Sequence, residues 1–175
     1  MLLRLPILIG GGGRGLSPRA LRQALELGNG WITAYLTESE LEQGIRQMHE
    51  GARSVGRGNE KLIVGLEMFV GMGSSDSQAV TTHSTSLTKT FVSVQEGVKR
   101  SLVGTTKTIA DKIESYEKTG LDYLESKFIY STIEDFAPSH APTPSRNLAI
   151  RSAPNSTTVT TSATTSVARI LRSLR

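Results

Sequence analysis

Residues 6–32, PILIGGGGRGLSPRALRQALELGNGWI, contain the clearest structural signals in the sequence. The apolar run Leu5–Ile9 ends in four consecutive glycines, Gly10–Gly13, a pattern typical of a strand that is buried on both faces. Ser17 and Pro18 then predict the start of a helix, with Ser17 as N-cap and Pro18 at the first helical position. The stretch therefore predicts a strand, a glycine-rich loop and a helix in succession.

The same alternation continues along the chain. Gly28 ends the first helix, and Thr37 with Glu40 forms a capping box that opens a second one. Thr105 caps a further helix, which Gly120 ends. The remaining elements that we predict are strands at Trp31–Leu36, Leu62–Val70 and Tyr123–Tyr130 and a helix within Val94–Leu102. This order predicts parallel strands joined by crossover helices, either in a doubly wound sheet or in part of a (β/α)₈ barrel.

Composition excludes several classes of protein. The chain has 175 residues, of which 37% are hydrophobic and 21% charged, so it is not disordered throughout. It has no cysteine, which excludes disulfides, thiolate metal sites and thiol nucleophiles. No apolar run is long enough to span a bilayer, and MLLRLPILIG lacks a cleavage-site pattern. We therefore expect a soluble, cytoplasmic protein without a membrane span.

The net charge of +4 is unevenly distributed. Residues 137–175 contain five arginines, no acidic residue and four of the six prolines, in a setting rich in serine and threonine. Residues 1–136 carry 15 basic and 16 acidic residues, a net charge of −1. We therefore expect a folded body over residues 1–136 and a disordered Ser/Thr/Pro/Arg tail over residues 137–175.

The glycine run is the sharpest local signal. Gly10, Gly12 and Gly15 satisfy the G-x-G-x-x-G pattern, but the helix starts only after Gly15, whereas the third glycine of a dinucleotide fingerprint lies inside the helix. We therefore favour a loop whose backbone N–H groups hold a phosphate. The alternative is a plain tight turn, which needs fewer glycines.

Other candidate residues carry weaker signals. His49 is expected on an exposed helix face, His83 in a polar stretch and His140 in the tail, and none has a second ligand at metal-binding spacing, so we expect no metal site. Asp76, Ser77 and His83 lack the nucleophile elbow of a hydrolase.

Glu67 lies in an apolar strand, where it would either face a barrel pocket with a raised pKa and serve in proton transfer, or be a partnered structural carboxylate.

The segment PILIGGGG…ALRQALELGNGWI resembles the luciferase-like family of flavin- and deazaflavin-dependent oxidoreductases. The family's Gly-Asp-Gly-Trp-like turn corresponds here to Gly28-Asn29-Gly30-Trp31. The resemblance returns in SLVGTTKTIADKIESYEKTGLDYLESKFIY, which is similar to the family's Val-Gly-Thr helix and final barrel strand. It covers residues 5–135, with a weak middle.

This resemblance implies a TIM-type barrel that binds FMN or a deazaflavin coenzyme and acts on a small-molecule substrate. Gly10, Gly11, Gly12 and Gly13 would lie along the ribityl chain and phosphate, and Arg14 would either pair with the phosphate or be solvated. Trp31 would border the cofactor or belong to the core. Gly104 and Thr105 would bind an anion or simply cap a helix. The resemblance identifies no catalytic side chain, because in this family the flavin carries the redox chemistry.

The body is short for such a barrel, which needs about 250 residues. We therefore expect an incomplete TIM-type (β/α) barrel, roughly its last four strands, truncated at its start and followed by an unrelated tail. The alternative function is a non-catalytic half-barrel that self-associates through its open sheet edges, with a basic tail that contacts an anionic surface. We expect no nucleic-acid partner for the enzyme.

Overall fold

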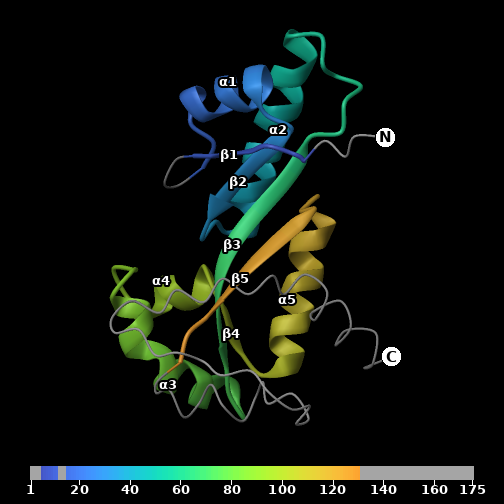
Figure 1. Ribbon diagram of the computed structural model, residues 1–175. Coiled ribbons are helices and arrows are strands. Elements are labelled where there is room, and N and C mark those ends of the chain that lie inside the picture. Colours follow the sequence, from blue (N-terminus) through green and yellow to red (C-terminus); the bar gives the residue numbers. More distant parts are fainter. Residues whose placement is uncertain (1–4, 12–14, 131–175) are drawn as a thin grey trace, which may run out of the picture.

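The computed structural model describes residues 5–11 and 15–130 (Figure 1). Five strands and five helices follow one another along these residues. They are β1 (Leu8–Gly10), α1 (Pro18–Leu27), β2 (Gly30–Ala34), α2 (Glu38–Ser54), β3 (Ile63–Met72), α3 (Asp76–Thr88), α4 (Val94–Lys99), β4 (Leu102–Gly104), α5 (Thr106–Lys118) and β5 (Tyr123–Phe128).

All strand pairs are parallel, and β3 is the strand on which the sheet is built (Figure 1). Val70 pairs with both Leu102 of β4 and Phe128 of β5, so β4 and β5 lie on opposite edges of β3. Residues 65–67 pair with both β2 and β5, which places β2 opposite β5 as well. The main arc is therefore β1-β2-β3-β5, and the short β4 continues the edge that β2 occupies. This open arc of four parallel strands, with its helices, confirms the predicted incomplete TIM-type barrel.

Local sequence signals explain the helix ends. The Ser17 side chain accepts a hydrogen bond from the Ala20 N–H, and Pro18 occupies the first turn of α1. Thr37 and Glu40 form the predicted capping box at the start of α2. Thr105 caps α5 by accepting a hydrogen bond from the Thr108 N–H. Each cap satisfies a backbone donor that the first helical turn leaves unpaired.

The main core lies between the sheet and helices α1, α2 and α5. Alternate residues of β3 are buried against these helices, and Trp31 of β2 is fully buried, so Trp31 belongs to the core. Gly44 of α2 lies against its indole ring: a Cβ there would come within 2.7 Å of two ring atoms. The opposite face of the sheet carries the partly exposed residues Glu67 and Phe69.

Two predicted elements differ clearly from the structure. The first strand is Leu8–Gly10 rather than Leu5–Ile9, and it is not buried on both faces, since Leu5 and Ile7 are exposed. The helix expected over Val94–Leu102 ends at Lys99, and the chain then enters β4.

Helix α3 was not predicted, because serine and threonine dominate it and only Ala79, His83 and Leu87 are buried at helical spacing. His83 is thus buried rather than part of a polar surface.

The predicted tail, residues 137–175, lies outside the described residues, so its disorder stays a prediction. Within residues 5–11 and 15–130, no helix is long and apolar enough to cross a membrane.

The contact between Gly44 and Trp31 gives a test of the core. Gly44→Ala should lower the free energy of unfolding by about 1–3 kcal/mol, because the added methyl group overpacks a rigid, buried ring despite alanine's higher helix propensity. Gln43→Ala on the exposed face of the same helix should change it by less than about 0.5 kcal/mol. Urea denaturation measures both values, and equal stability of the two variants would contradict the packing described here.

Candidate functional site

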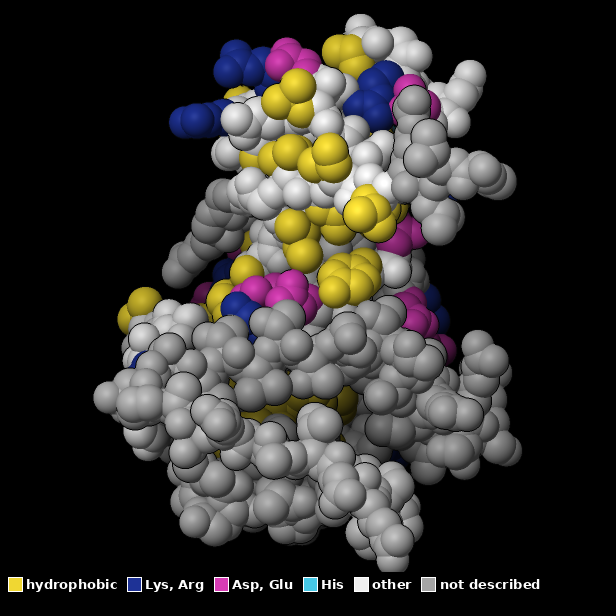
Figure 2. All heavy atoms as spheres, viewed as in Figure 1, with side chains coloured by type: hydrophobic (Ala, Val, Ile, Leu, Met, Phe, Trp, Pro, Cys, Tyr) yellow, Lys and Arg dark blue, Asp and Glu magenta, His cyan; other side chains and the backbone are white. Residues whose placement is uncertain are grey.

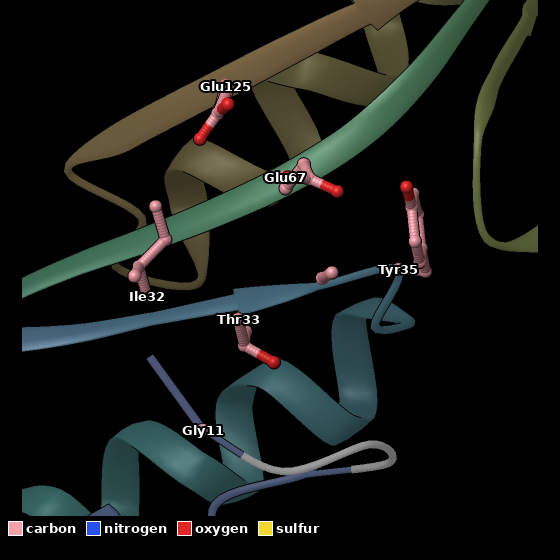
Figure 3. Close-up of a pocket in the computed structure, with 7 residues that line it drawn as sticks. Gly11, Ile32, Thr33, Tyr35, Glu67 and Glu125 are labelled. Carbon is pink, nitrogen blue, oxygen red and sulfur yellow. The ribbon is translucent and has the colours of Figure 1, made fainter. Parts of the chain in front are cut away.

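A pocket of about 440 Å³ opens on the face of the sheet away from the helices (Figure 3). Its volume lies within the range of about 300–1,000 Å³ that small-molecule and cofactor sites occupy. It begins at the end of β1, follows the last residues of β2 and reaches β3 and β5. The lining residues are Gly11, Ile32, Thr33, Ala34, Tyr35, Glu67 and Glu125.

Strand register brings the polar residues together. Ala34 of β2 pairs with Glu67 of β3, which pairs with Glu125 of β5, so the three residues stand side by side across the sheet. Figure 3 shows the Glu67 and Glu125 side chains on the pocket side, with Tyr35 facing Glu67. The pocket therefore lies where the strand β2 ends, the edge at which parallel α/β barrels place their sites.

Glu67 links the pocket to a neighbouring strand. Its carboxylate forms an ion pair with Lys127 of β5, with a distance of 2.7 Å between Nζ and Oε2. The Glu67 side chain is only 18% exposed, whereas that of Lys127 is 41% exposed. The Glu67 carboxylate is therefore partnered and also lines the pocket, whereas its role in proton transfer stays a prediction.

Tyr35 has the most unusual backbone in this region. Its φ of 57° makes it the one residue other than glycine, among those described, with positive φ. Burial raises the pKa of the Tyr35 hydroxyl, and the neighbouring Glu67 carboxylate raises it further. Its ring packs against Phe69, with centroids 4.8 Å apart, and against Phe91 at 5.4 Å.

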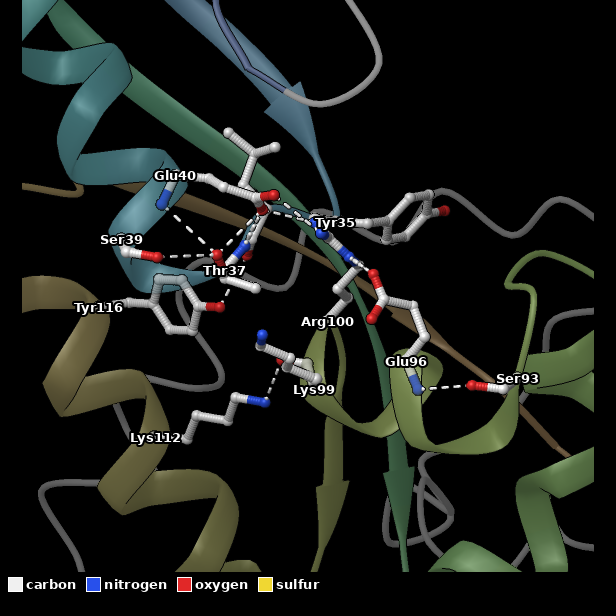
Figure 4. Close-up of polar contacts among 11 residues, drawn as sticks. Tyr35, Thr37, Ser39, Glu40, Ser93, Glu96, Lys99, Arg100, Lys112 and Tyr116 are labelled. Atoms are coloured by element: carbon white, nitrogen blue, oxygen red, sulfur yellow. Dashed lines mark hydrogen bonds and ion pairs between the residues drawn. The ribbon is translucent and has the colours of Figure 1, made fainter.

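A buried arginine fixes the backbone of Tyr35 (Figure 4). The Arg100 side chain is 9% exposed, and its Nη1 donates to the Tyr35 carbonyl oxygen at 2.9 Å. The same guanidinium pairs with both carboxylate oxygens of Glu40 and with Glu96 one helical turn away. Hydrogen bonding to Arg100 lowers the pKa of Glu40 to about 2, against the opposing effect of its partial burial.

The glycine loop borders the opposite end of the pocket. The Gly11 carbonyl oxygen accepts a hydrogen bond from the Trp31 indole N–H, and a Cβ on Gly11 would stand 2.3 Å from the Ala20 Cβ. At Gly10, no atom of the described residues beyond its chain neighbours lies within 4 Å of such a Cβ. Of the predicted cofactor-binding residues, Gly11 lines the pocket and Gly10 precedes it, whereas Gly12, Gly13 and Arg14 lie outside the described residues.

At the second predicted anion site, Gly104 and Thr105, a carboxylate of the same chain takes the place of an external anion. The Thr105 N–H, at the N-terminus of α5, donates to the Asp76 carboxylate at 2.8 Å, and the Thr108 hydroxyl donates to the same carboxylate. Gly104 adopts a φ of 152° beside this contact. Gly104 and Thr105 therefore form the capped start of α5, which is bonded to Asp76 of α3.

The histidines form no catalytic or metal-binding group in the described residues. His49 is exposed on α2, as expected. His83 is buried, and its Nε2 lies 3.2 Å from the Met72 carbonyl oxygen, whereas Asp76 is engaged by α5, so the two do not form a triad. No cluster of three or more potential metal ligands occurs among residues 5–11 and 15–130, and His140 lies outside them.

Sequence reasoning missed Tyr35, Arg100, Glu125 and Lys127. Tyr35 lies near the end of the predicted strand Trp31–Leu36 and two residues before a helix cap, and the ends of strands are where barrel enzymes carry functional side chains. Glu125 and Lys127 alternate along β5, which indicates that they share one face of the sheet. Arg100 gave no such signal, because its partners are 60 residues and more away in the sequence except Glu96.

The Glu40–Arg100 pair predicts an acid-sensitive stability. Because the pKa of Glu40 in the folded protein lies near 2, below its ordinary value of 4.5, its contribution is present above pH 4.5 and is lost as the pH falls toward 2. Glu40→Gln should cost on the order of 2 kcal/mol at pH 7, and the difference from the wild type should shrink on acidification.

The matched control is Glu42→Gln, on the same helix, which removes only an exposed pair with Arg46. Denaturation at pH 7, 5 and 3 measures the difference. A constant gap between the wild type and Glu40→Gln across this range would rule out the coupling.

Comparison with solved structures shows the same fold in two oxidoreductases. One is an F420-dependent secondary alcohol dehydrogenase in complex with an F420–acetone adduct, with a TM-score of 0.59 and 15% sequence identity over 77% of this chain and 46% of that one. The other is the coenzyme F420-dependent tetrahydromethanopterin reductase from Methanopyrus kandleri, with a TM-score of 0.55 and 16% identity over 71% of this chain and 45% of that one. The chain thus spans about half the length of these structures.

Comparison with curated protein sequences finds no match. Residues 4–100, more than half of the chain, match the sequence model of the luciferase-like monooxygenases. The matched region includes β1, β2 and β3 and with them the glycine loop, Tyr35 and Glu67. This match agrees with the parallel half-barrel and its two structural neighbours. The chain therefore belongs to the luciferase-like monooxygenase family.

Proposed function

We propose that the chain is part of a flavin- or deazaflavin-dependent oxidoreductase of the luciferase-like type and binds its cofactor in the pocket between Gly11 and Tyr35. The observation that carries this proposal is the position of the pocket, at the C-terminal end of β2 in a half-barrel of this family. The two F420-dependent neighbours favour a deazaflavin over FMN. The chain would then supply the later strands of the barrel, and a small-molecule substrate would enter from the open face.

The pocket fits such a cofactor through the contrast between its two ends. Lys127 neutralises Glu67, but Glu125 leaves a net negative charge at one end, so a phosphate group is repelled from it. The other end meets the glycine loop, where close approach of a ligand to the backbone is possible because Gly10 carries no side chain and no other described residue fills the space at its Cβ position. The proposed orientation of the cofactor therefore has its phosphate toward Gly10–Gly13 and Arg14 and its ring system toward Tyr35.

The residues of the chain would bind and orient the cofactor, and the bound cofactor would supply the redox chemistry by transferring a hydride or activating oxygen. Gly10, Gly11, Gly12 and Gly13 would contact the ribityl chain and phosphate, with Arg14 as the counter-charge. Glu67 and Lys127, already paired, would form the polar wall beside the ring system. Ile32 would contribute apolar contact on the same face.

The open space at Gly10 allows a test that spares the fold. Gly10→Leu should leave the thermal unfolding midpoint within about 2 °C of the wild type, because among the described residues no atom outside the neighbours of Gly10 lies within 4 Å of the added Cβ. It should nevertheless weaken FMN binding at least about tenfold, because the side chain fills the space assigned to the ligand. Titration followed by flavin fluorescence measures the affinity, and a reduced deazaflavin coenzyme is titrated in parallel.

Two controls separate the parts of this proposal. Riboflavin lacks the phosphate, so Arg14→Ala should weaken FMN binding and leave riboflavin binding unchanged. Gly11→Val is less informative, because its Cβ collides with Ala20 and the loss of binding would accompany a loss of stability. If the wild-type chain binds neither FMN nor the deazaflavin, the proposed cofactor is wrong.

The alternative function, self-association of a half-barrel, has one structural observation in its favour. Among the described strands, β1 and β5 each pair along one edge only, with β2 and β3 respectively. Unpaired edges favour association with another strand. Figure 2 shows hydrophobic side chains over the part of the visible face where β1, β2 and the start of β3 lie in Figure 1. In this alternative the basic segment 137–175 would contact an anionic surface.

Sedimentation velocity over a range of protein concentrations tests the alternative. Self-association through β1 predicts a dimer that Leu8→Lys disrupts, because the substitution puts a charge on the edge strand. Leu27→Lys, an exposed position at the end of α1, is the matched control and should leave the dimer intact. A chain that remains monomeric at high micromolar concentration would exclude this function.

A further inference from the structure

We propose that Tyr35 contacts the planar ring system of the bound cofactor and that Arg100 is the positioning residue that holds Tyr35 in place for this contact. The inference rests on the proposed function and names the residue that determines how the ring system is bound. Four observations on the described residues support the inference. They are the backbone conformation of Tyr35, the hydrogen bonds of its loop, its aromatic neighbours and its position in the pocket.

The backbone of Tyr35 is strained. A φ of 57° lies in the left-handed region, which an L-residue with a bulky side chain seldom adopts and which glycine or asparagine occupies at lower cost. Strained conformations of this kind persist only where surrounding structure enforces them, and they cluster at functional sites. The choice of a tyrosine here therefore needs a reason beyond the turn itself.

The loop between β2 and α2 has its backbone groups fixed one after another. The Tyr35 N–H donates to the Glu67 carbonyl oxygen at 2.9 Å, and the Tyr35 carbonyl accepts from Arg100 at the same distance. The Leu36 carbonyl accepts from the buried Tyr116 hydroxyl at 2.7 Å. The Thr37 N–H donates to Glu40, which itself pairs with Arg100. Arg100 thus holds this loop directly at the Tyr35 carbonyl oxygen and indirectly through Glu40, which binds the Thr37 N–H (Figure 4).

The enforced conformation presents the Tyr35 ring to the pocket. Phe69 and Phe91 support the ring, the first in a tilted and the second in an edge-on arrangement. Tyr35 lines the pocket, whereas neither Phe69 nor Phe91 does. Neither of the hydrophobic core clusters formed by the described residues includes Tyr35, so the ring does not serve to fill the core.

These contacts identify the class of ligand that the residue suits. An aromatic ring that packs against Phe69 and Phe91 offers a planar, polarisable surface to the pocket. A flat conjugated ring system gains most from such a surface, through offset or edge-on ring contacts. Electron-rich phenol rings close to a flavin quench its fluorescence, which provides a readout other than activity.

Tyr35→Asn separates a role in binding from a role in the fold. Asparagine tolerates the left-handed conformation, so the thermal unfolding midpoint should not fall. The affinity for FMN should fall about tenfold, and the FMN that still binds should fluoresce more strongly than with the wild type. Tyr123→Asn, on the same sheet face but outside the pocket, is the matched control. It should change neither the affinity for FMN nor the fluorescence of the bound FMN.

A double-mutant cycle tests the role of Arg100. Arg100→Lys keeps the charge beside Glu40 and Glu96 but loses the planar fork that reaches the Tyr35 carbonyl. It should weaken FMN binding about threefold to tenfold in the wild type and have no further effect in the Tyr35→Asn background. A variant that is merely less stable would weaken binding equally in both backgrounds, and that result would overturn the positioning role.

The outcomes distinguish this inference from the proposed function. If the wild type binds FMN and Tyr35→Asn binds it equally well with the same quenching, the Tyr35 contact is wrong and the proposed function stands. If binding and the unfolding midpoint fall together in Tyr35→Asn, the ring is structural and the inference is overturned. If the wild type binds neither FMN nor the deazaflavin, the proposed function fails and the inference fails with it.

Discussion

Parallel pairing along both edges of β3 determines which side chains meet in the pocket. It sets Ala34, Glu67 and Glu125 side by side and places them on the sheet face opposite the helices. Because successive residues of a strand point to opposite faces, a shift of one residue in either pairing would turn these side chains into the core. The buried alternation of Val64, Leu66 and Met68 against the helices opposes such a shift. The alternation of buried residues along β3 therefore also determines which residues of the strand face the pocket.

The β2–α2 loop joins stability to the site. Arg100 is nearly buried, which is costly for a charge unless several partners compensate for lost hydration. Glu40, Glu96 and the Tyr35 carbonyl provide that compensation, and they also tie α2, α4 and the end of β2 together. The same contacts that satisfy a buried cation thus hold a residue of the pocket in an unfavourable conformation.

The sequence allowed much of the fold and part of the site to be predicted. The helix caps at Ser17, Thr37 and Thr105 could be predicted because each hydrogen bond of a cap joins residues only three positions apart. Helix α3 was not, since its few buried residues are spread through a run of serine and threonine. The acidic end of the pocket escaped prediction for a different reason: it arises only when three strands align, and no local pattern encodes that alignment. Arg100 likewise acquires its role through partners distant in the sequence.

The proposed ligand site is the face between the glycine loop and Tyr35. To test it, FMN and the deazaflavin coenzyme are added separately to the ¹⁵N-labelled chain, and the backbone amide resonances are followed. The shifted resonances should belong to Gly10, Gly11, Ala34, Tyr35 and Glu67. Those of Thr105 and Thr108, at the capped start of α5, should stay unchanged. Perturbations that centre on α5, or that are absent with both ligands at millimolar concentration, would overturn the proposed site.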